Sequence, residues 1–245
     1  MPTLSKNNPQ SITPNRLWQA VSDRFPEQRD CLASFLAFEC AEVLAGVKPG
    51  NLINIVNRCK PCGRNLYKLW QRFGLDIMAQ TPLSVEILAD RGHSLLVYTY
   101  RPELLANTLG SPAAQNFLTR AGYPLAPGPE EALVELGNRL KQQDFPHEIG
   151  LFLGYPIKDV EGFLGWSDQP FTCQGPWKIY GDPKPSLHLA DRHRSCRNRM
   201  IHRLARTDDP MLCMVAPPAS VRRPREGKKH PGAQSSHRND AFSAA

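Results

Sequence analysis

The sequence predicts an α/β or α+β fold, a single domain in which helices pack on a mixed sheet. Helical patterns and short β-rich runs alternate along the chain, so one core contains both kinds of element. The 245 residues are 41% hydrophobic and 22% charged, as in ordinary globular domains. The two ends are polar and rich in proline. We therefore expect a flexible arm at 1–14, one domain at 15–212 and a disordered basic tail at 213–245.

Helices are expected wherever apolar residues recur every three or four positions. Apolar side chains fill most positions of 29–45, which predicts a buried helix that stops at Gly46. Residues 127–143 begin with a proline and two glutamates, as helix N-termini favour, and carry a stripe of leucines. Further helices are expected at 15–24, at 63–73 ending at Gly74, after Pro102, after Ser111-Pro112, at 156–164 and at 186–206.

Strands are expected in four places. Residues 51–56 alternate apolar and polar side chains. Residues 83–102 contain two β-rich runs around a turn at 90–93, which predicts a hairpin. The apolar run at 147–154 and the segment at 176–181 supply the remaining strands.

Charge and cysteine usage limit the class of protein. The net charge is +7, yet residues 1–191 contain 18 Lys/Arg and 19 Asp/Glu, so the basic charge belongs to the C-terminal part. The start lacks the apolar segment of a secretory signal, and apolar runs fall short of the roughly 20 residues of a membrane helix. Seven cysteines, an odd number, favour reduced thiols. We expect a cytoplasmic protein that no membrane anchors.

Several segments together resemble a known family. They are LLVYTYRPELL, FLTRAGYP, FPHEIGLFLGYPIKDVEGFL, GPWKIYGD and HRSCR, in this order, with FECAEVLAGVKPGNL near the start. This set resembles the uncharacterised domain of unknown function 3793, a family typified by clostridial and related anaerobic bacteria, with PHE and LGYP as its hallmark motifs. The resemblance spans about residues 30–206 and departs from the family at Ala41-Glu42, where the family pattern is Ala-Pro. It implies a small cytoplasmic bacterial protein but no activity.

His147 and Glu148 are the first candidates for catalysis. A histidine at a strand end, tuned by a carboxylate, can act as a general base or bind a metal. Adjacent residues in a strand point to opposite faces, so the two cannot act on one atom from a regular strand. In the alternative, Glu148 pairs with an arginine such as Arg101 or Arg139 and has a structural role.

Four further residues are candidate ligand-binding groups. Tyr155 follows the apolar run, while Lys178 and Tyr180 share the face of their expected strand that core packing leaves unexplained. Asp182 follows directly and could orient a histidine. Gly150 and Gly154 permit close backbone packing, and the helix after Pro156 could receive an anion at its start.

The cysteines suggest two weaker kinds of site. Cys59 and Cys62 have the spacing of a metal-binding or redox pair, although the second pair that a zinc site needs is missing. Cys40, His147 and Asp182 occur in the chain order of papain-like enzymes, but Cys40 lies within an apolar helix where thiols are usually inert.

The last expected helix is rich in arginine. Arg192, Arg199, Arg203 and Arg206 crowd one flank of its apolar stripe, and Arg194 and Arg197 lie on the other. This pattern fits either arginines at the rim of a packed helix or a ridge that binds polyanions. The helix lacks base-stacking aromatic residues, which disfavours specific nucleic-acid binding.

The leading hypothesis is a binding or accessory protein for a small molecule or protein partner, with a link to metal or redox physiology. One alternative is an enzyme that uses His147 as general base with a carboxylate partner. Another is a weak polyanion or nucleic-acid binder that uses the arginine-rich helix and the tail. The residues identify no cofactor.

Overall fold

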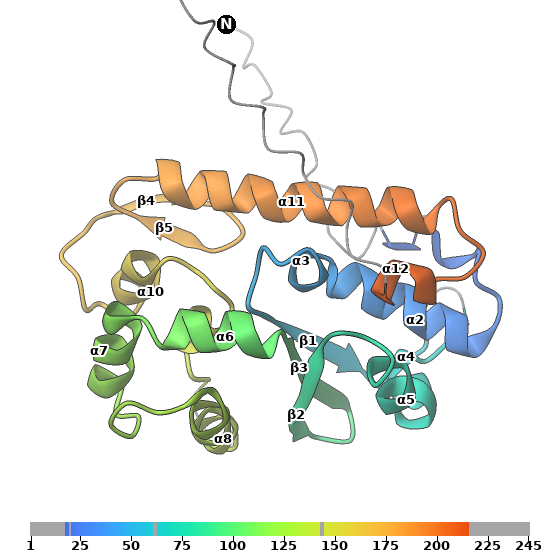
Figure 1. The fold of residues 1–245 in the computed structure, drawn as a ribbon, viewed down its shortest axis with the longest axis horizontal. Helices are drawn as coiled ribbons and strands as arrows, with labels where there is room; N and C mark the ends of the chain where they lie inside the picture. Colours follow the sequence, from blue (N-terminus) through green and yellow to red (C-terminus); the bar gives the residue numbers. More distant parts are fainter. Residues whose placement is uncertain (1–17, 20, 61–62, 143–144, 216–245) are drawn as a thin grey trace, which may run out of the picture.

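The computed structural model describes residues 18–19, 21–60, 63–142 and 145–215 of the chain. Figure 1 labels most of the helices and strands of this part. In chain order they are α2 (Gln28–Glu39), α3 (Ala41–Leu44), β1 (Gly50–Val56), α4 (Leu66–Leu69), η1 (Trp70–Gly74), α5 (Leu75–Met78), β2 (Ser84–Asp90), β3 (Ser94–Tyr100), α6 (Pro102–Leu109), α7 (Pro112–Arg120), α8 (Pro129–Leu140), α9 (Ile149–Phe152), α10 (Ile157–Phe163), β4 (Phe171–Gln174), β5 (Lys178–Tyr180), α11 (Lys184–Leu204) and α12 (Met211–Val215). None of these helices is both long and apolar enough to cross a membrane.

The central sheet contains β1, β3 and β2 in that order, and both pairs are antiparallel. The predicted hairpin is confirmed as β2 and β3, with a turn in which the N–H of Gly92 donates to Asp90 Oδ1. The prediction of a mixed sheet is wrong, because every pair of neighbouring strands is antiparallel. β1 and β2 run in the same direction, but β3 lies between them and they do not pair. A second, antiparallel sheet consists of β4 and β5. The fold is therefore α+β.

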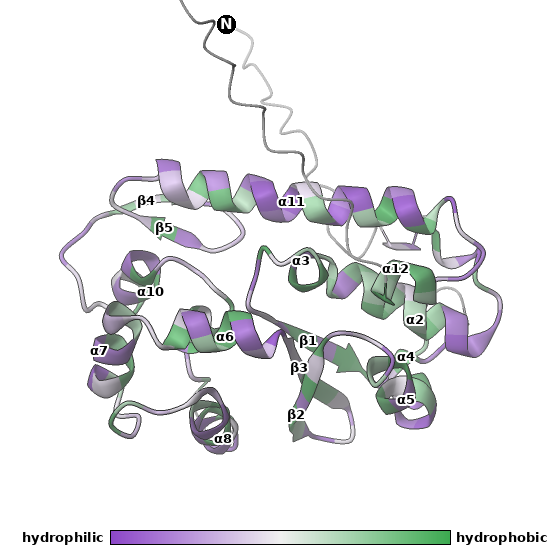
Figure 2. Cartoon of the chain, in the orientation of Figure 1, coloured by the Kyte–Doolittle hydropathy of each residue, from purple (hydrophilic) through white to green (hydrophobic). Residues whose placement is uncertain are grey.

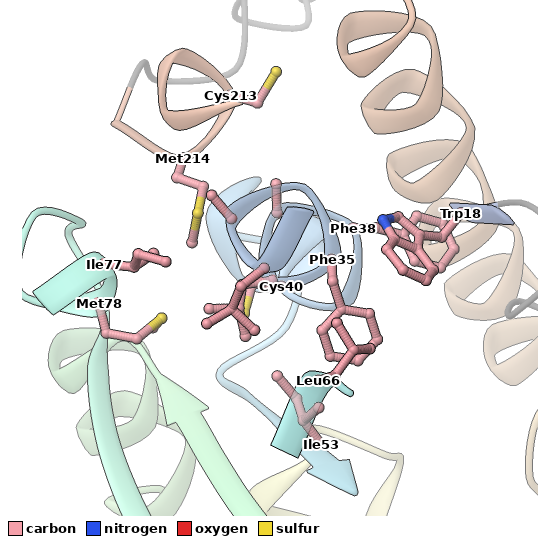
Figure 3. Packing of buried hydrophobic residues seen from close by; sticks show 14 of the residues in the cluster. Trp18, Phe35, Phe38, Cys40, Ile53, Leu66, Ile77, Met78, Cys213 and Met214 are labelled. Atoms are coloured by element: carbon pink, nitrogen blue, oxygen red, sulfur yellow. The ribbon is translucent and has the colours of Figure 1, made fainter. Parts of the chain in front are cut away.

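Helices cover both faces of the central sheet. In β3, Leu95 and Val97 pack into a hydrophobic cluster with α2 and α4, while Tyr98 and Tyr100 pack into a second cluster with α6, α8 and α9. Alternate residues of a strand point to opposite faces, and here both faces are covered by helices. This explains why β3 is apolar along nearly its whole length. Figure 1 shows α6 and α8 on one side of the strands and α4 and α5 on the other. Figure 3 shows part of the first cluster, with Phe35 of α2 close to Leu66 of α4.

The helix α11 runs along the length of the molecule, beside the small sheet at one end and over α2 at the other (Figure 1). Its hydrophilic and hydrophobic residues alternate along the helix in Figure 2, as expected for a helix with one buried stripe. The predicted last helix is thus confirmed. Its buried residues are Ser186, Ala190, His193, Cys196, Met200 and Leu204.

The segment 147–154 contains the short helix α9 between two turns, and not the strand that its apolar run predicts. The N–H of Leu153 donates to the carbonyl of Ile149, and Gly154 then ends α9 with a φ of 72°. A short apolar run fits a buried strand or a buried helix equally well. Here α9 is enclosed by α6 and α10, and all four of its residues are buried. His147 and Glu148 are therefore not bound to the alternation of a strand.

The helix predicted at 63–73 begins and ends later than its sequence suggests. It starts at Leu66, where the side chain of Asn65 accepts hydrogen bonds from the N–H groups of Tyr67 and Lys68. It then passes Gly74 through the π-helical segment η1 and ends with α5. Gly74 lies against the ring of Trp70, where a Cβ atom would approach within 2.5 Å, so it serves packing and does not stop the helix.

The remaining helices lie close to their predicted places. The helix predicted at 29–45 forms α2 and α3, with a break at Cys40. The side chain of Ser111 caps α7 as predicted. The predicted arm, residues 15–17 and 20 of the helix at 15–24, and residues 216–245 lie outside the described part of the chain. The tail is predicted to begin at residue 213, yet Cys213 and Met214 are buried in α12, which packs against α2 (Figure 3).

Candidate functional site

A cavity of about 260 Å³ lies where the segment around α9 meets α10 and β5. Three of the predicted site residues, His147, Tyr155 and Lys178, line it. Apart from the buried Asp159, its other lining residues are aliphatic, glycine or aromatic. We call it the aromatic cavity, after the wall formed by Phe145, His147, Tyr155, Phe163 and Trp177.

The open side of the aromatic cavity combines exposed rings with basic groups. The ring of His147 lies between Phe145 and Phe163, with centroids 5.8 and 4.9 Å away. Lys178 Nζ lies 5.2 Å from the centroid of the Phe163 ring. Phe145 is 46% exposed and Phe163 41% exposed, so two large apolar side chains meet solvent side by side with His147 at the rim. The rim therefore offers apolar surface and positive charge together.

The inner wall of the aromatic cavity is formed by stacked rings and a hydrogen-bonded carboxylate. The rings of Tyr155 and Trp177 stack with centroids 4.5 Å apart, and Trp177 Nε1 donates to Asp159 Oδ2 over 2.8 Å. Asp159 also accepts from Ser186 Oγ and from Lys158 Nζ. Burial raises the pKa of Asp159, but these hydrogen bonds outweigh burial and lower it overall. Asp159 is thus an ionised anchor for the wall and a poor general base.

Glu148 does not share the aromatic cavity with His147. It is buried, and its Oε1 accepts from Arg139 Nη1 over 3.2 Å and from the hydroxyl of Tyr123 over 3.4 Å. The guanidinium of Arg139 also donates to the carbonyls of Ala121 and Gly122. The predicted pair with Arg139 is confirmed, and Glu148 joins α8, the loop after α7 and the start of α9.

Tyr180 and Asp182 lie outside the lining of the aromatic cavity. The ring of Tyr180 packs on the backbone of Gly162, at a distance that leaves no room for a Cβ atom, and forms an edge contact with Phe171. Asp182 is exposed, and its Oδ1 accepts from the N–H of Lys184 at the start of α11. Both residues therefore have a structural role in this arrangement.

The glycines of the predicted strand allow close packing, although in a helical segment. A Cβ atom on Gly150 would lie 2.9 Å from Val160, across the contact between α9 and α10. Gly154 approaches the ring of Pro49, where a Cβ atom would lie 2.5 Å from Cδ. The helix that follows, α10, has seven residues and supplies no anion site on its own.

The cysteine candidates do not assemble a site among the described residues. Cys59 is exposed and pairs through its backbone with Asn65, while Cys62 lies outside the described residues. No group of three or more histidine, cysteine or acidic side chains in the described ranges is placed to hold a metal ion. Cys40 is buried against Thr99, and burial raises the pKa of its thiol to about 12, which opposes a nucleophilic thiolate.

A buried charge cluster lies behind the wall of the aromatic cavity, and we did not predict it from the sequence. It consists of Glu39, Glu42, Lys48, His193 and Arg197. Arg197 donates from Nε to Glu42 Oε1 over 2.6 Å, and its Nη2 lies 3.6 Å from Glu39 Oε2. Glu42 and Lys48 are 3% and 6% exposed.

Two aromatic rings connect this cluster with the aromatic cavity. Lys48 Nζ lies 5.8 Å from the centroid of the Tyr155 ring, and the rings of His193 and Trp177 lie 5.9 Å apart. The signal that could have revealed the cluster is the presence of Glu42, Lys48 and Arg197 within otherwise buried patterns, because buried charges occur only with partners.

The arginines of α11 have different surroundings. Arg197 is the ion-pair partner of α2 and α3, while Arg194 pairs with Asp191 at the surface. Arg203 donates to the carbonyl of Leu212, and Arg199 contacts the sulfur of Cys196. Binding of a polyanion through this helix and the tail stays a prediction.

Comparison with known proteins places the chain in a family. Neither a curated protein nor a solved structure matches it. A family model described as "Protein of unknown function (DUF3793)" matches residues 36–212. The matched span runs from α2 to α12 and contains the central sheet, the aromatic cavity and α11. Because the match covers more than half of its length, the chain belongs to the DUF3793 family.

Proposed function

We propose that this protein binds a small molecule with an apolar body and an anionic group in the aromatic cavity. The observation that carries the proposal is a concave, mainly apolar site with two basic side chains at its open side. The predicted cytoplasmic location is kept as part of this proposal.

The shape of the ligand follows from the lining of the cavity. Stacked and edge-on rings form its walls, and such surfaces favour flat or aromatic ligands. The volume of about 260 Å³ lies just below the range of roughly 300 to 1,000 Å³ usual for ligand pockets, so the ligand is small.

The anionic group follows from the charges at the rim. Among the described residues, neither His147 nor Lys178 forms a salt bridge. Asp159, the carboxylate in the lining, is already bonded to Trp177, Ser186 and Lys158. Among the described residues, the rim therefore presents a lysine ammonium and a histidine that no acid pairs with, a setting that suits a carboxylate or sulfonate.

The geometry favours binding over acid–base catalysis by His147. A general base needs a group that orients it, and Glu148 is engaged with Arg139 and Tyr123. Asp182, the other proposed partner, lies outside the cavity lining. The enzyme hypothesis thus lacks its carboxylate, while the binding hypothesis uses the same histidine without one.

Fluorescence titration can test the proposal with two related probes. The first, 8-anilinonaphthalene-1-sulfonate, has an apolar body and an anionic group, and N-phenyl-1-naphthylamine has a similar body without charge. We expect saturable binding of one molecule of each. Lys178→Gln should weaken binding of the anionic probe by about tenfold, because one charge-assisted contact is lost, and leave the uncharged probe within about twofold.

Two control variants separate this site from other surfaces. Phe163→Ala should weaken both probes, because it removes apolar wall. Lys184→Gln, at an exposed lysine outside the cavity lining, should change neither. Absence of saturable binding, or an equal loss for both probes in Lys178→Gln, would contradict the proposal.

A further inference from the structure

Lys48 is a buried amine one ring away from the aromatic cavity. Its Nζ donates to Asn51 Oδ1 over 2.6 Å and lies 5.8 Å from the centroid of Tyr155, whose side chain lines the cavity. The chain beyond it stays close to the cavity, since Pro49 packs on Gly154 and Leu52 is part of the lining. The amine therefore sits directly behind the wall of the proposed ligand site.

Two polar atoms of the buried charge cluster have no hydrogen-bond partner within the described part of the chain. They are Glu42 Oε2 and His193 Nε2. Glu42 is 3% and His193 7% exposed, so solvent does not readily replace the missing partners. A buried carboxylate oxygen or ring nitrogen without a partner destabilises the fold. Such atoms are rare in folded proteins and often have a role in chemistry or binding.

The surroundings of Lys48 favour the uncharged amine. Burial lowers the pKa of Lys48 to about 8, with Arg197 acting in the same direction and Glu42 and Glu39 in the opposite one. Near neutral pH a larger share of this amine is therefore uncharged than in a lysine at its ordinary pKa. A desolvated lysine beside another cation is a known arrangement for amines that attack carbonyl groups.

We propose that Lys48 condenses with an aldehyde or ketone whose apolar part occupies the aromatic cavity, to form an imine. The inference rests on the proposed function, because the cavity must hold the body of the ligand. It adds the chemical class of that ligand, a carbonyl compound. Tyr155 lies between the amine and the cavity, so its ring must turn aside as the carbonyl reaches Nζ.

The proposed step is balanced without an oxidant or reductant. The lone pair of Nζ attacks the carbonyl carbon, and the carbonyl oxygen takes a proton to give a carbinolamine. The attacking nitrogen loses one proton and the departing hydroxyl gains one, so these proton transfers balance. Loss of water then forms the C=N bond.

Reductive trapping tests the inference directly. The folded full-length protein is treated with 4-carboxybenzaldehyde, a flat carbonyl compound with a carboxylate, and sodium cyanoborohydride. Peptide mapping by mass spectrometry then locates the adduct. We expect one main adduct, on Lys48, formed at least about tenfold faster than on the exposed Lys184, with a rate that rises to a midpoint near pH 8.

Variants and a binding control separate the two proposals. Lys48→Arg and Lys48→Met should abolish the main adduct, and Lys184→Arg should leave it unchanged, while circular dichroism verifies that each variant is folded. An adduct on Lys178 at the rim in place of Lys48, or equal rates at Lys48 and Lys184 in the wild type, would overturn the imine proposal. In either case, saturable binding of the anionic naphthalene probe would still support the proposed function. Absence of that binding would contradict both the proposed function and the imine proposal.

Discussion

At the scale of single residues, the two neighbours His147 and Glu148 have different roles. The helical start of α9 places His147 at the rim of the aromatic cavity and buries Glu148 against Arg139. A carboxylate that pairs with arginine and accepts from Tyr123 is a structural anchor, since breaking such a buried pair leaves a charge without a partner. The contact of Glu148 with Arg139 therefore links α8 to the segment that positions His147.

His193 gives a prediction for the dependence of stability on pH. Burial lowers the pKa of His193 to about 4, and nearby Lys48 acts in the same direction, whereas the unfolded imidazole titrates near 6.5. Between these values the unfolded chain binds a proton that the native chain does not, so the free energy of unfolding falls as pH falls from 6.5 to 4. We expect His193→Gln to reduce this slope in urea denaturation measured across that range.

The exposed His188, on the same helix, provides the matched control. His188→Gln should keep the wild-type slope between pH 4 and 6.5, because it removes an exposed imidazole and leaves the buried one. The explanation fails if both variants change the slope equally, or if His193→Gln leaves it as in the wild type.

At the scale of elements, the sequence was informative wherever periodicity ran over many residues. The long helices α2, α8 and α11 and the hairpin of β2 and β3 follow from apolar spacing, capping residues and a glycine turn. The short run at 147–154 was mistaken for a strand, because four to eight apolar residues have no period long enough to separate the two states. Its helical state is fixed by contacts with α6 and α10, which lie outside the segment.

Gly154 gives a prediction at this scale. Its φ of 72° strains any other residue, and a Cβ atom would in addition collide with Pro49. We expect Gly154→Ala to lower the free energy of unfolding by about 2 to 4 kcal/mol, measured by urea denaturation. Gly165 has a φ of 70° and open space around it, so Gly165→Ala isolates the backbone cost, about 1 to 2 kcal/mol. Equal losses in both variants would show that the contact with Pro49 carries no weight.

At the scale of the whole molecule, the site could be predicted only in part. His147, Tyr155 and Lys178 were identified as candidates from unexplained polar or aromatic positions, and all three line one cavity. The buried charge cluster was missed, because Glu42 and Arg197 are 155 residues apart and only the packing of α11 on α3 brings them together. Local patterns carry no information about such a distant partner.

The shared sheet predicts that the two hydrophobic clusters unfold together. Leu36 and Leu136 are fully buried in different clusters, on opposite faces of the central sheet. We expect Leu36→Ala and Leu136→Ala each to lower the free energy of unfolding by about 2 to 5 kcal/mol, in a single transition with an unchanged denaturant slope. Two separate transitions in either variant, followed by circular dichroism and tryptophan fluorescence, would contradict this.

The ion pair between Glu42 and Arg197 also sets an order for biosynthesis. The chain is made from its N-terminus, so Glu42 and Lys48 leave the ribosome long before α11 exists to cover them. Until then, α2 and α3 expose apolar surface next to charges that still lack a partner. The nascent protein therefore cannot complete its first hydrophobic cluster early, and we expect native structure to form only after synthesis has passed α11.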